Sequence, residues 1–188
     1  MVLGYVIDVP DIKRDMLQSL KLEECAKYSN IYDLNQIDAN FKLKSIRYNI
    51  SSTYDGFVIV SAKFKQFCEI EKYAGLDFIL LPNASGFCWF KVNNIIEFDT
   101  KMRKTKFLNY NSICKGYEEI IGANPVYLKN PVLLSEGFFR TDVCFGSFAG
   151  KSPLYLTGEA TKKKLLAAGF KEIFFEKILD KYDLGKNN

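Results

Sequence analysis

Residues 153–178 (PLYLTGEATKKKLLAAGFKEIFFEKI) constrain the fold of this chain most strongly. The apolar run at residues 154–156 predicts a strand, and Thr157 follows it as an expected N-cap, whose hydroxyl accepts an amide of the first helical turn. The helix is expected to end before Gly169, because glycine adopts a positive φ at little cost. A second strand is predicted at residues 173–175.

Residues 57–82 repeat this order of elements. A strand is predicted at 57–60, Ser61 is the expected N-cap, Gly75 is the expected helix stop, and a further strand is predicted at 78–81. Two explanations remain open. Internal duplication gives such repeats, and so does convergence, because any strand–helix–strand unit needs a cap and a stop.

The pattern as a whole predicts an α/β (α+β) fold with a mixed sheet, in which the two strand–capped helix–strand units flank a β-rich middle. We expect a single domain over residues 1–188, with an internal pseudo-duplication as one reading. Its parts are 1–56 (a strand at 4–9, a helix at 11–28 and a strand with a β-bulge near Ser45), 57–82, 83–152 (with a hairpin of strands 87–92 and 94–98), and 153–178. The tail, residues 179–188, is expected to fray.

Composition excludes several classes of protein. The net charge is only +4 and the cations are spread along the chain, so we expect no nucleic-acid partner. No apolar run approaches the roughly 20 residues that span a bilayer, and the N-terminus lacks the basic start of a signal peptide. We therefore expect no membrane association and a cytoplasmic location. Trp89, the single tryptophan, is expected in the core.

The reactive residues argue against catalysis. The chain has no histidine, which removes Ser-His-Asp and Cys-His mechanisms and histidine-ligated zinc. No glycine-rich phosphate loop is present. The five cysteines are far apart and never form a C-x-x-C pair, so reduced thiols are expected, several of them buried. We predict no catalytic residue, no metal and no cofactor.

The connector at residues 133–151 (LLSEGFFRTDVCFGSFAGK) is the strongest candidate for recognition. It is rich in glycine and phenylalanine, and irregular segments of this kind often carry binding residues. The alternative is structural: an Arg140–Asp142 ion pair that holds the loop over the core. The candidate partner- or ligand-binding residues are Phe138, Arg140, Asp142, Phe148 and Lys151.

Residues 57–178 resemble bacterial immunity-type proteins encoded beside polymorphic toxins, and the nearest branch is the double-CXXCG motif family. Ser61 and Phe64 match its strand-to-helix turn. Its closing segment is matched by Thr157, Leu165, Gly169, Ile173 and Phe175. The resemblance implies a cytoplasmic protein that neutralises a cognate protein toxin by direct contact.

One departure from the family pattern lies at residues 111–116 (NSICKG), where that branch has C-x-x-C-G and binds a metal. Only Cys114 remains here. Since a structural zinc site needs four ligands, we predict none.

A second class of function stays open beside the immunity-like one. In this alternative the chain is a small-ligand-binding or enzymatic α/β domain, and Arg140 grips an anionic group through its two-pronged guanidinium. A pocket where Arg140, Asp142 and Lys151 converge would favour the ligand. An exposed aromatic patch would favour a protein partner. The sequence leaves the oligomeric state open.

Overall fold

The structure is a computed structural model that describes residues 1–43 and 47–180. In this part of the chain, four α-helices and eleven strands form two sheets, which confirms the predicted α+β class. The expected β-bulge near Ser45 and the expected fraying of residues 181–188 lie outside the described residues.

The larger sheet has seven strands in the order β11-β1-β10-β9-β8-β7, and β6 pairs with β9 beside this path. The bounds are β1 Val2–Asp8, β6 Ile95–Ile96, β7 Lys106–Asn111, β8 Gly116–Ile121, β9 Phe138–Ser147, β10 Ser152–Thr157 and β11 Phe174–Leu179. Neighbouring strands are antiparallel except β6 and β9, which are parallel, so this sheet is mixed.

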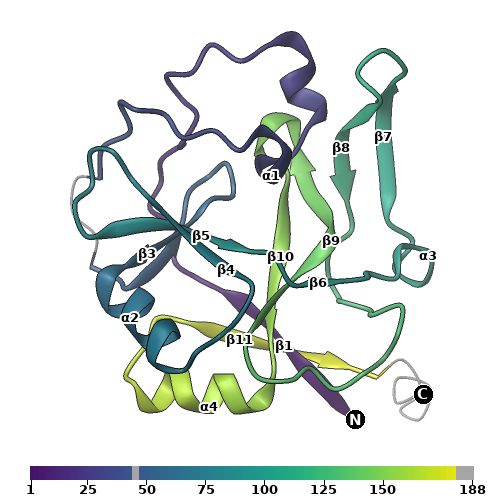
Figure 1. The fold of residues 1–188 in the computed structure, drawn as a ribbon. Coiled ribbons are helices and arrows are strands. Elements are labelled where there is room, and N and C mark those ends of the chain that lie inside the picture. Colours follow the sequence, from purple (N-terminus) through teal and green to yellow (C-terminus); the bar gives the residue numbers. More distant parts are fainter. Residues whose placement is uncertain (44–46, 181–188) are drawn as a thin grey trace.

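The smaller sheet has four strands in the order β2-β3-β5-β4, all antiparallel to their neighbours. Its strands are β2 Ile50–Ser52, β3 Val58–Ser61, β4 Leu76–Leu80 and β5 Phe87–Val92. The predicted strand at 87–92 is therefore confirmed to the residue. Figure 1 shows this sheet, with α2 beside it, on the opposite side of the molecule from the β7–β8 hairpin.

The two predicted units share one topology. In the first, the chain runs from β3 through α2 (Ala62–Ile70) to β4. β5 lies between these two strands in the sheet and is antiparallel to both. In the second, the chain runs from β10 through α4 (Glu159–Ala167) to β11, and β1 lies between these two strands and is antiparallel to both. Each unit lies in its own sheet. Duplication and convergence both remain compatible with this arrangement.

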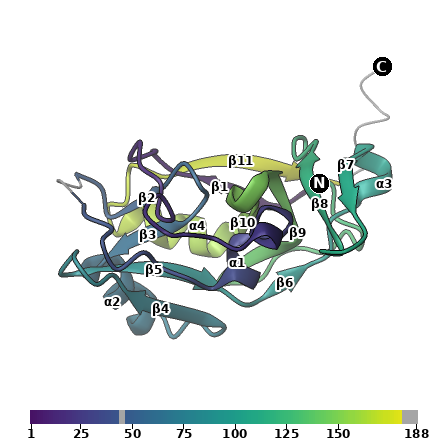
Figure 2. The same ribbon diagram turned by 90° about the horizontal axis from the view of Figure 1, so that it is seen from above.

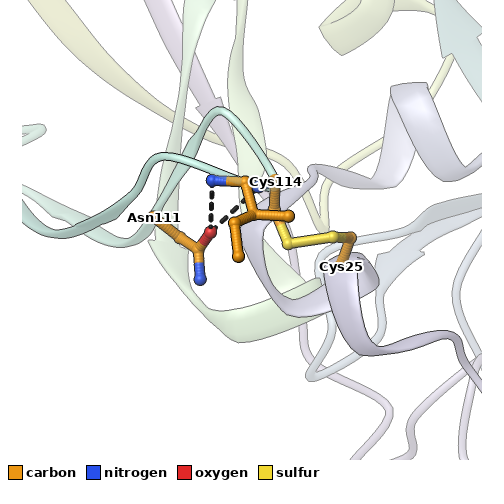
Figure 3. The surroundings of a disulfide bond; sticks show 4 residues. Cys25, Asn111 and Cys114 are labelled. Carbon is orange, nitrogen blue, oxygen red and sulfur yellow. Dashed lines mark hydrogen bonds between the residues drawn. A yellow bond between two sulfur atoms is a disulfide. The ribbon is translucent and has the colours of Figure 1, made fainter.

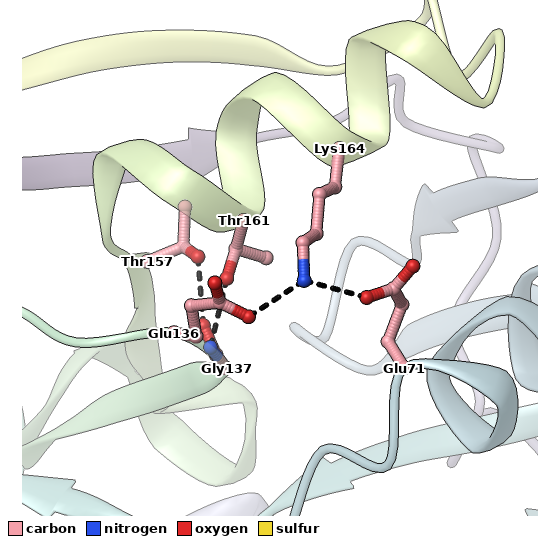
Figure 4. Close-up of polar contacts among 6 residues, drawn as sticks. All are labelled: Glu71, Glu136, Gly137, Thr157, Thr161 and Lys164. Atoms are coloured by element: carbon pink, nitrogen blue, oxygen red, sulfur yellow. Dashed lines mark hydrogen bonds and ion pairs between the residues drawn. The ribbon is translucent and has the colours of Figure 1, made fainter.

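The helix caps of the two units differ. The Ser61 hydroxyl accepts a hydrogen bond from the Phe64 amide at 3.3 Å, which confirms the first cap. The prediction for Thr157 is wrong, because α4 begins one residue later and its N-cap, Gly158, has no side chain to offer. The Thr157 hydroxyl instead donates to the Gly137 carbonyl at 2.7 Å (Figure 4). Its strand position is fully buried, so this bond satisfies a polar group inside the core.

Further polar contacts hold the start of β9 against α4 (Figure 4). The Gly137 amide donates to the Thr161 hydroxyl at 2.8 Å. The Lys164 ammonium lies 2.7 Å from a carboxylate oxygen of both Glu71, just after α2, and Glu136, just before β9. These contacts join the residues just before β9 to the end of α2 and to α4.

The main core lies between the two sheets and the two longer helices. Phe64 of α2 packs its ring against those of Phe90, Phe138 and Phe170, with centroids 5.4, 5.8 and 5.2 Å away. The N-terminal segment covers the smaller sheet with a second cluster that contains Trp89, which is 0% exposed as predicted. A third cluster includes residues of β1, β9, β10 and β11 together with the chain around residues 126–134.

The helix predicted at 11–28 is wrong. Lys13 has a φ of +54°, which is incompatible with a helix interior. The amides of Met16 and Leu17 donate to the carboxylate of Asp55 at 2.9 and 2.8 Å, so they find acceptors without a helix. Between residues 11 and 34, the only helices are a 3₁₀ helix, η1 (Glu24–Tyr28), and one turn of α-helix, α1 (Ile31–Leu34).

The hairpin predicted around Asn93-Asn94 is also wrong. β6 pairs with β9 of the larger sheet rather than with β5. The Asn94 amide group donates to the carbonyls of Ala74 at 2.8 Å and Phe138 at 3.0 Å, so the chain crosses here from one sheet to the other.

Most of the connector at 133–151 is a strand, which corrects the prediction of an irregular segment there. Residues 138–147 form β9, paired with β10 on one side and with β6 and β8 on the other. Buried residues such as Phe138 and Thr141 explain why this glycine- and phenylalanine-rich segment joins the sheet. A short 3₁₀ helix, η2 (Phe148–Gly150), follows.

The β7–β8 hairpin and α3 (Thr100–Arg103) stand together at one end of the molecule in both views (Figures 1 and 2). β7 is an edge strand of the larger sheet. Within residues 1–43 and 47–180, no helix combines the length and the apolar character needed to cross a membrane.

Candidate functional site

Phe138, the first predicted site residue, belongs to the core. It is 0% exposed, and its ring contacts those of Phe64, Tyr73 and Phe90 with centroid distances of 5.8, 5.5 and 5.1 Å. Such a residue stabilises the fold and cannot meet a partner.

Arg140 is engaged within the protein. Its Nε donates to the Val92 carbonyl at 2.9 Å, one Nη donates to the Thr141 carbonyl at 3.2 Å, and the guanidinium carbon lies 4.3 Å from the ring centroid of Tyr32. These contacts join β9 to β5 and α1. Among the ion pairs of the described residues, none joins Arg140 to Asp142, so the pairing considered from the sequence does not form.

Asp142 and Lys151 lie on one hollow. One carboxylate oxygen of Asp142 accepts from the amides of Phe98 at 2.8 Å and Val143 at 3.0 Å, while the side chain stays exposed. Lys151 is only 2% exposed, and its Nζ donates to the carbonyls of Lys27 at 2.7 Å, Phe148 at 2.5 Å and Glu118 at 3.3 Å.

Burial lowers the pKa of Lys151 to about 8, and the three carbonyls accept all three ammonium hydrogens. The side chain therefore joins η1, β8 and η2 and has no donor left for a ligand. Phe148, by contrast, is 55% exposed and has a φ of +53°, a conformation that costs energy for a bulky residue. Its carbonyl is one of the three acceptors of Lys151.

The hollow shared by Asp142 and Lys151 has a volume of ≈ 260 Å³ and lies between the β7–β8 hairpin, β9 and η1. We call it the hairpin groove. Its lining is Tyr28, Asn30, Phe107, Gly116, Tyr117, Ile120, Asp142, Val143, Cys144 and Lys151. Arg140 is not part of this lining, so the three polar residues of the ligand hypothesis do not converge on it.

Aromatic rings lie on the hairpin side of the groove, where Phe107 and Tyr117 line it and Tyr110 extends the aromatic surface beyond the lining. Phe107 and Tyr110 are three residues apart, a spacing that places side chains on opposite faces of a regular strand. Asn109 between them has a φ of +54°, which asparagine tolerates better than most residues. Both rings therefore contact Tyr117, with centroid distances of 5.1 and 5.0 Å. Phe107 is 39% exposed and Tyr110 is 58% exposed.

A disulfide fixes the hairpin to the opposite side of the groove. Cys114, in the hairpin turn, is bonded to Cys25 of η1 (Figure 3). The Asn111 side chain accepts from the amides of Ile113 and Cys114, each at 2.9 Å, and so shapes the turn. Gly116 permits the close approach, because a Cβ there would lie 2.6 Å from the Tyr28 carbonyl oxygen.

This disulfide corrects the expectation that all five cysteines are reduced thiols. Cys68, Cys88 and Cys144 are free and buried, as expected for several of them. Desolvation raises the pKa of the Cys144 thiol to about 12, so this cysteine of the groove stays protonated and is a poor nucleophile. Within the described residues, no group of three or more potential ligands could hold a metal ion.

Two other hollows carry less chemistry. One, of ≈ 520 Å³, borders α3, where Lys129 is paired with Glu97 at 2.9 Å and the Asp142 carboxylate is bonded to the Phe98 amide. Another, of ≈ 430 Å³, lies between the start of β1 and α4. Neither combines exposed aromatic rings with a fixed frame.

Sequence reasoning missed the aromatic residues of the groove. Tyr28 is distant in sequence from Phe107 and Tyr117 of the hairpin, and the signal for these residues was weak. It consisted of aromatic residues at 107 and 110 in a lysine-rich segment.

Comparisons with protein-family models, with curated proteins and with solved structures found no match to this chain. Inference of function therefore depends on the residues described above.

Proposed function

We propose that the chain is a non-catalytic binding protein of the bacterial immunity type, which neutralises a cognate protein toxin by direct contact at the hairpin groove. The observation that carries this proposal is the aromatic surface of Phe107, Tyr110 and Tyr117. It is exposed on one face of a hairpin and supported by a covalent bond to η1. Exposed aromatic residues on a rigid frame are typical of protein interfaces.

The residues expected to grip an anion support the same proposal. Lys151 has no unused donor, and Arg140 directs its Nε and one Nη to backbone carbonyls and does not line the hollow of Lys151, so the two cations do not form one anion site. The ligand-binding or enzymatic alternative remains a prediction. It requires Arg140 to bind an anionic group while its guanidinium keeps the hydrogen bonds to the Val92 and Thr141 carbonyls. A cytoplasmic location likewise remains a prediction, and a disulfide is more typical of oxidising compartments.

The test uses the purified protein as bait in an extract of its native host, with bound proteins identified by mass spectrometry. We expect stoichiometric capture of a toxin encoded next to this chain, and loss of the toxin's activity in the complex. Phe107→Ala should weaken capture, whereas Phe174→Ala, which removes an even more exposed ring (64% exposed) from β11, should not. If no toxin is captured but a metabolite raises the melting temperature in an Arg140-dependent manner, the ligand alternative replaces this proposal.

A further inference from the structure

The outer half of the β7–β8 hairpin extends beyond the ladder of the larger sheet. The ladder between β8 and β9 has two residue pairs, Glu119 with Ser147 and Ile120 with Gly146. Both pairs lie in the C-terminal half of β8. Among the described strands, the ladder partners of residues 109–118 lie only within the hairpin itself. The position of this outer half therefore depends on contacts outside the sheet ladder.

The disulfide is the covalent contact between this outer half and η1 (Figure 3). Two non-covalent contacts lie beside it. The Gly116 backbone lies against that of Tyr28, and the Lys151 ammonium donates to the Glu118 carbonyl at 3.3 Å, which is the longest of its three bonds. Cleavage of the disulfide would leave only such non-covalent contacts to hold the hairpin against η1.

The five cysteines differ in their exposure to a reductant. Cys25 and Cys114 are both partly exposed, whereas Cys68, Cys88 and Cys144 are free and buried. Desolvation raises the pKa of all three free thiols. Because thiol–disulfide exchange proceeds through the thiolate, these three are poor competitors for the bond. A dissolved dithiol therefore acts on the Cys25–Cys114 pair without rearrangement among the other cysteines.

We propose that the Cys25–Cys114 disulfide is a redox-sensitive latch, which holds the hairpin groove in its binding shape when oxidised and is opened by a dithiol. This inference rests on the proposed function and adds its regulation. One thiolate of the dithiol attacks a sulfur of the bond and releases the other cysteine, which takes up a proton. The second thiol of the dithiol then displaces the first cysteine. Two cysteine thiols form, and the dithiol is oxidised to a disulfide.

Cys144 reports the state of the latch. It lines the hairpin groove but is only 6% exposed, because the hairpin and η1 form the other walls. Movement of the hairpin away from η1 would let solvent reach it. Cys68 of α2 and Cys88 of β5 belong instead to the main core between the two sheets. Global unfolding exposes all three thiols alike, so a larger response of Cys144 measures local opening.

The test measures alkylation of the native protein by iodoacetamide, with each cysteine followed by peptide mass spectrometry. One sample is oxidised, and the other has been reduced with dithiothreitol, which is then removed without admitting oxygen. We expect reduction to accelerate the reaction of Cys144 at least about tenfold more than those of Cys68 and Cys88. Oxidised glutathione, added to the reduced protein, should re-form the bond and restore the slow reaction.

Matched variants locate the effect at the latch. Cys25→Ser combined with Cys114→Ser should give the fast reaction of Cys144 with or without dithiothreitol. Cys88→Ala removes a free thiol but keeps the latch, so its Cys144 should respond to dithiothreitol as in the wild type.

Equal acceleration of the three free cysteines would overturn the inference, and so would a Cys144 that stays slow after reduction or does not recover with oxidised glutathione. These measurements need no toxin, so failure of the inference differs from failure of the proposed function. Equal capture of a toxin by the oxidised and reduced proteins contradicts the inference alone. A reversible Cys144 response without any captured toxin supports the latch and contradicts the immunity assignment.

Discussion

Lys151 shows how one residue can determine the shape of a site without acting in it. A lysine at 2% exposure is rare, and this one is retained because its three hydrogens meet three carbonyls from η1, β8 and η2. The three carbonyls belong to a 3₁₀ helix, a strand of the hairpin and a second 3₁₀ helix, which are distant in sequence from one another. The ammonium therefore fixes the base of the hairpin groove.

The depressed pKa of Lys151 predicts a stability that depends on pH. Its pKa is 10.5 in an unperturbed state and about 8 in the folded protein. Between these values the unfolded chain binds a proton that the folded chain does not, so the free energy of unfolding should rise with pH across this window. The expected gain is about 2–3 kcal/mol.

The measurement is urea unfolding at pH 7, 9 and 10.5 for the wild type and for Lys151→Met, which fills similar volume and does not titrate. Groups common to both proteins cancel in the difference between the two free energies. We expect the wild type to gain stability relative to the variant as the pH rises. A difference that stays constant over this range would show that Lys151 titrates normally.

At the scale of elements, two hydroxyls with the same apparent role act differently. Ser61 caps α2, whereas Thr157 ends β10 and bonds to the Gly137 carbonyl. The difference arises because α4 begins after Gly158, so Thr157 still belongs to the buried strand β10. There its hydroxyl is within reach of the Gly137 carbonyl, just before β9.

Substitution of the two hydroxyls should separate these roles. Ser61→Ala should lower the free energy of unfolding by about 1 kcal/mol and speed amide exchange at the first turn of α2. Thr157→Val should cost about 1–3 kcal/mol, because it leaves the buried Gly137 carbonyl without its partner. Hydrogen exchange should then increase at the start of β9. Faster exchange confined to the first turn of α4 would instead restore Thr157 as a cap.

At the scale of the whole molecule, the disulfide joins η1 to the turn of the β7–β8 hairpin and so closes a long loop of the chain. Cys25 and Cys114 are 89 residues apart in sequence. The bond therefore restricts a long segment of the unfolded chain, which includes the whole smaller sheet. It also prevents the β7–β8 hairpin from moving away from η1.

Removal of this bond should destabilise the protein and loosen the groove. Cys25→Ser combined with Cys114→Ser is expected to lower the free energy of unfolding by about 2–4 kcal/mol and to increase hydrogen exchange in β7 and β8. As an independent measure of connectivity, alkylation of the denatured, unreduced protein should label three cysteines, Cys68, Cys88 and Cys144. Labelling of five cysteines before reduction would contradict the bond.

The sequence alone determined the local features of this protein. It located the strand at 87–92, the cap at Ser61 and the burial of Trp89. It also identified the helix stop at Gly169, which has a φ of +85° directly after the C-cap of α4. The stop predicted at Gly75 is wrong, because α2 ends at Ile70 and Lys72, with a φ of +56°, follows its C-cap. These features depend on hydrogen bonds or backbone angles within a few residues, or on an apolar surface that any fold must bury. Local chemistry is sufficient to specify them.

Tertiary structure decided the partners of these elements. β9 was expected as a loop, yet it pairs with the three strands β6, β8 and β10, and burial makes Phe138 and Phe145 core residues. The hairpin groove combines η1, the β7–β8 hairpin and β9, three parts of the chain that are far apart in sequence. A sequence pattern cannot reveal such a site, because the contacts that form it depend on how two sheets pack and on which cysteines meet.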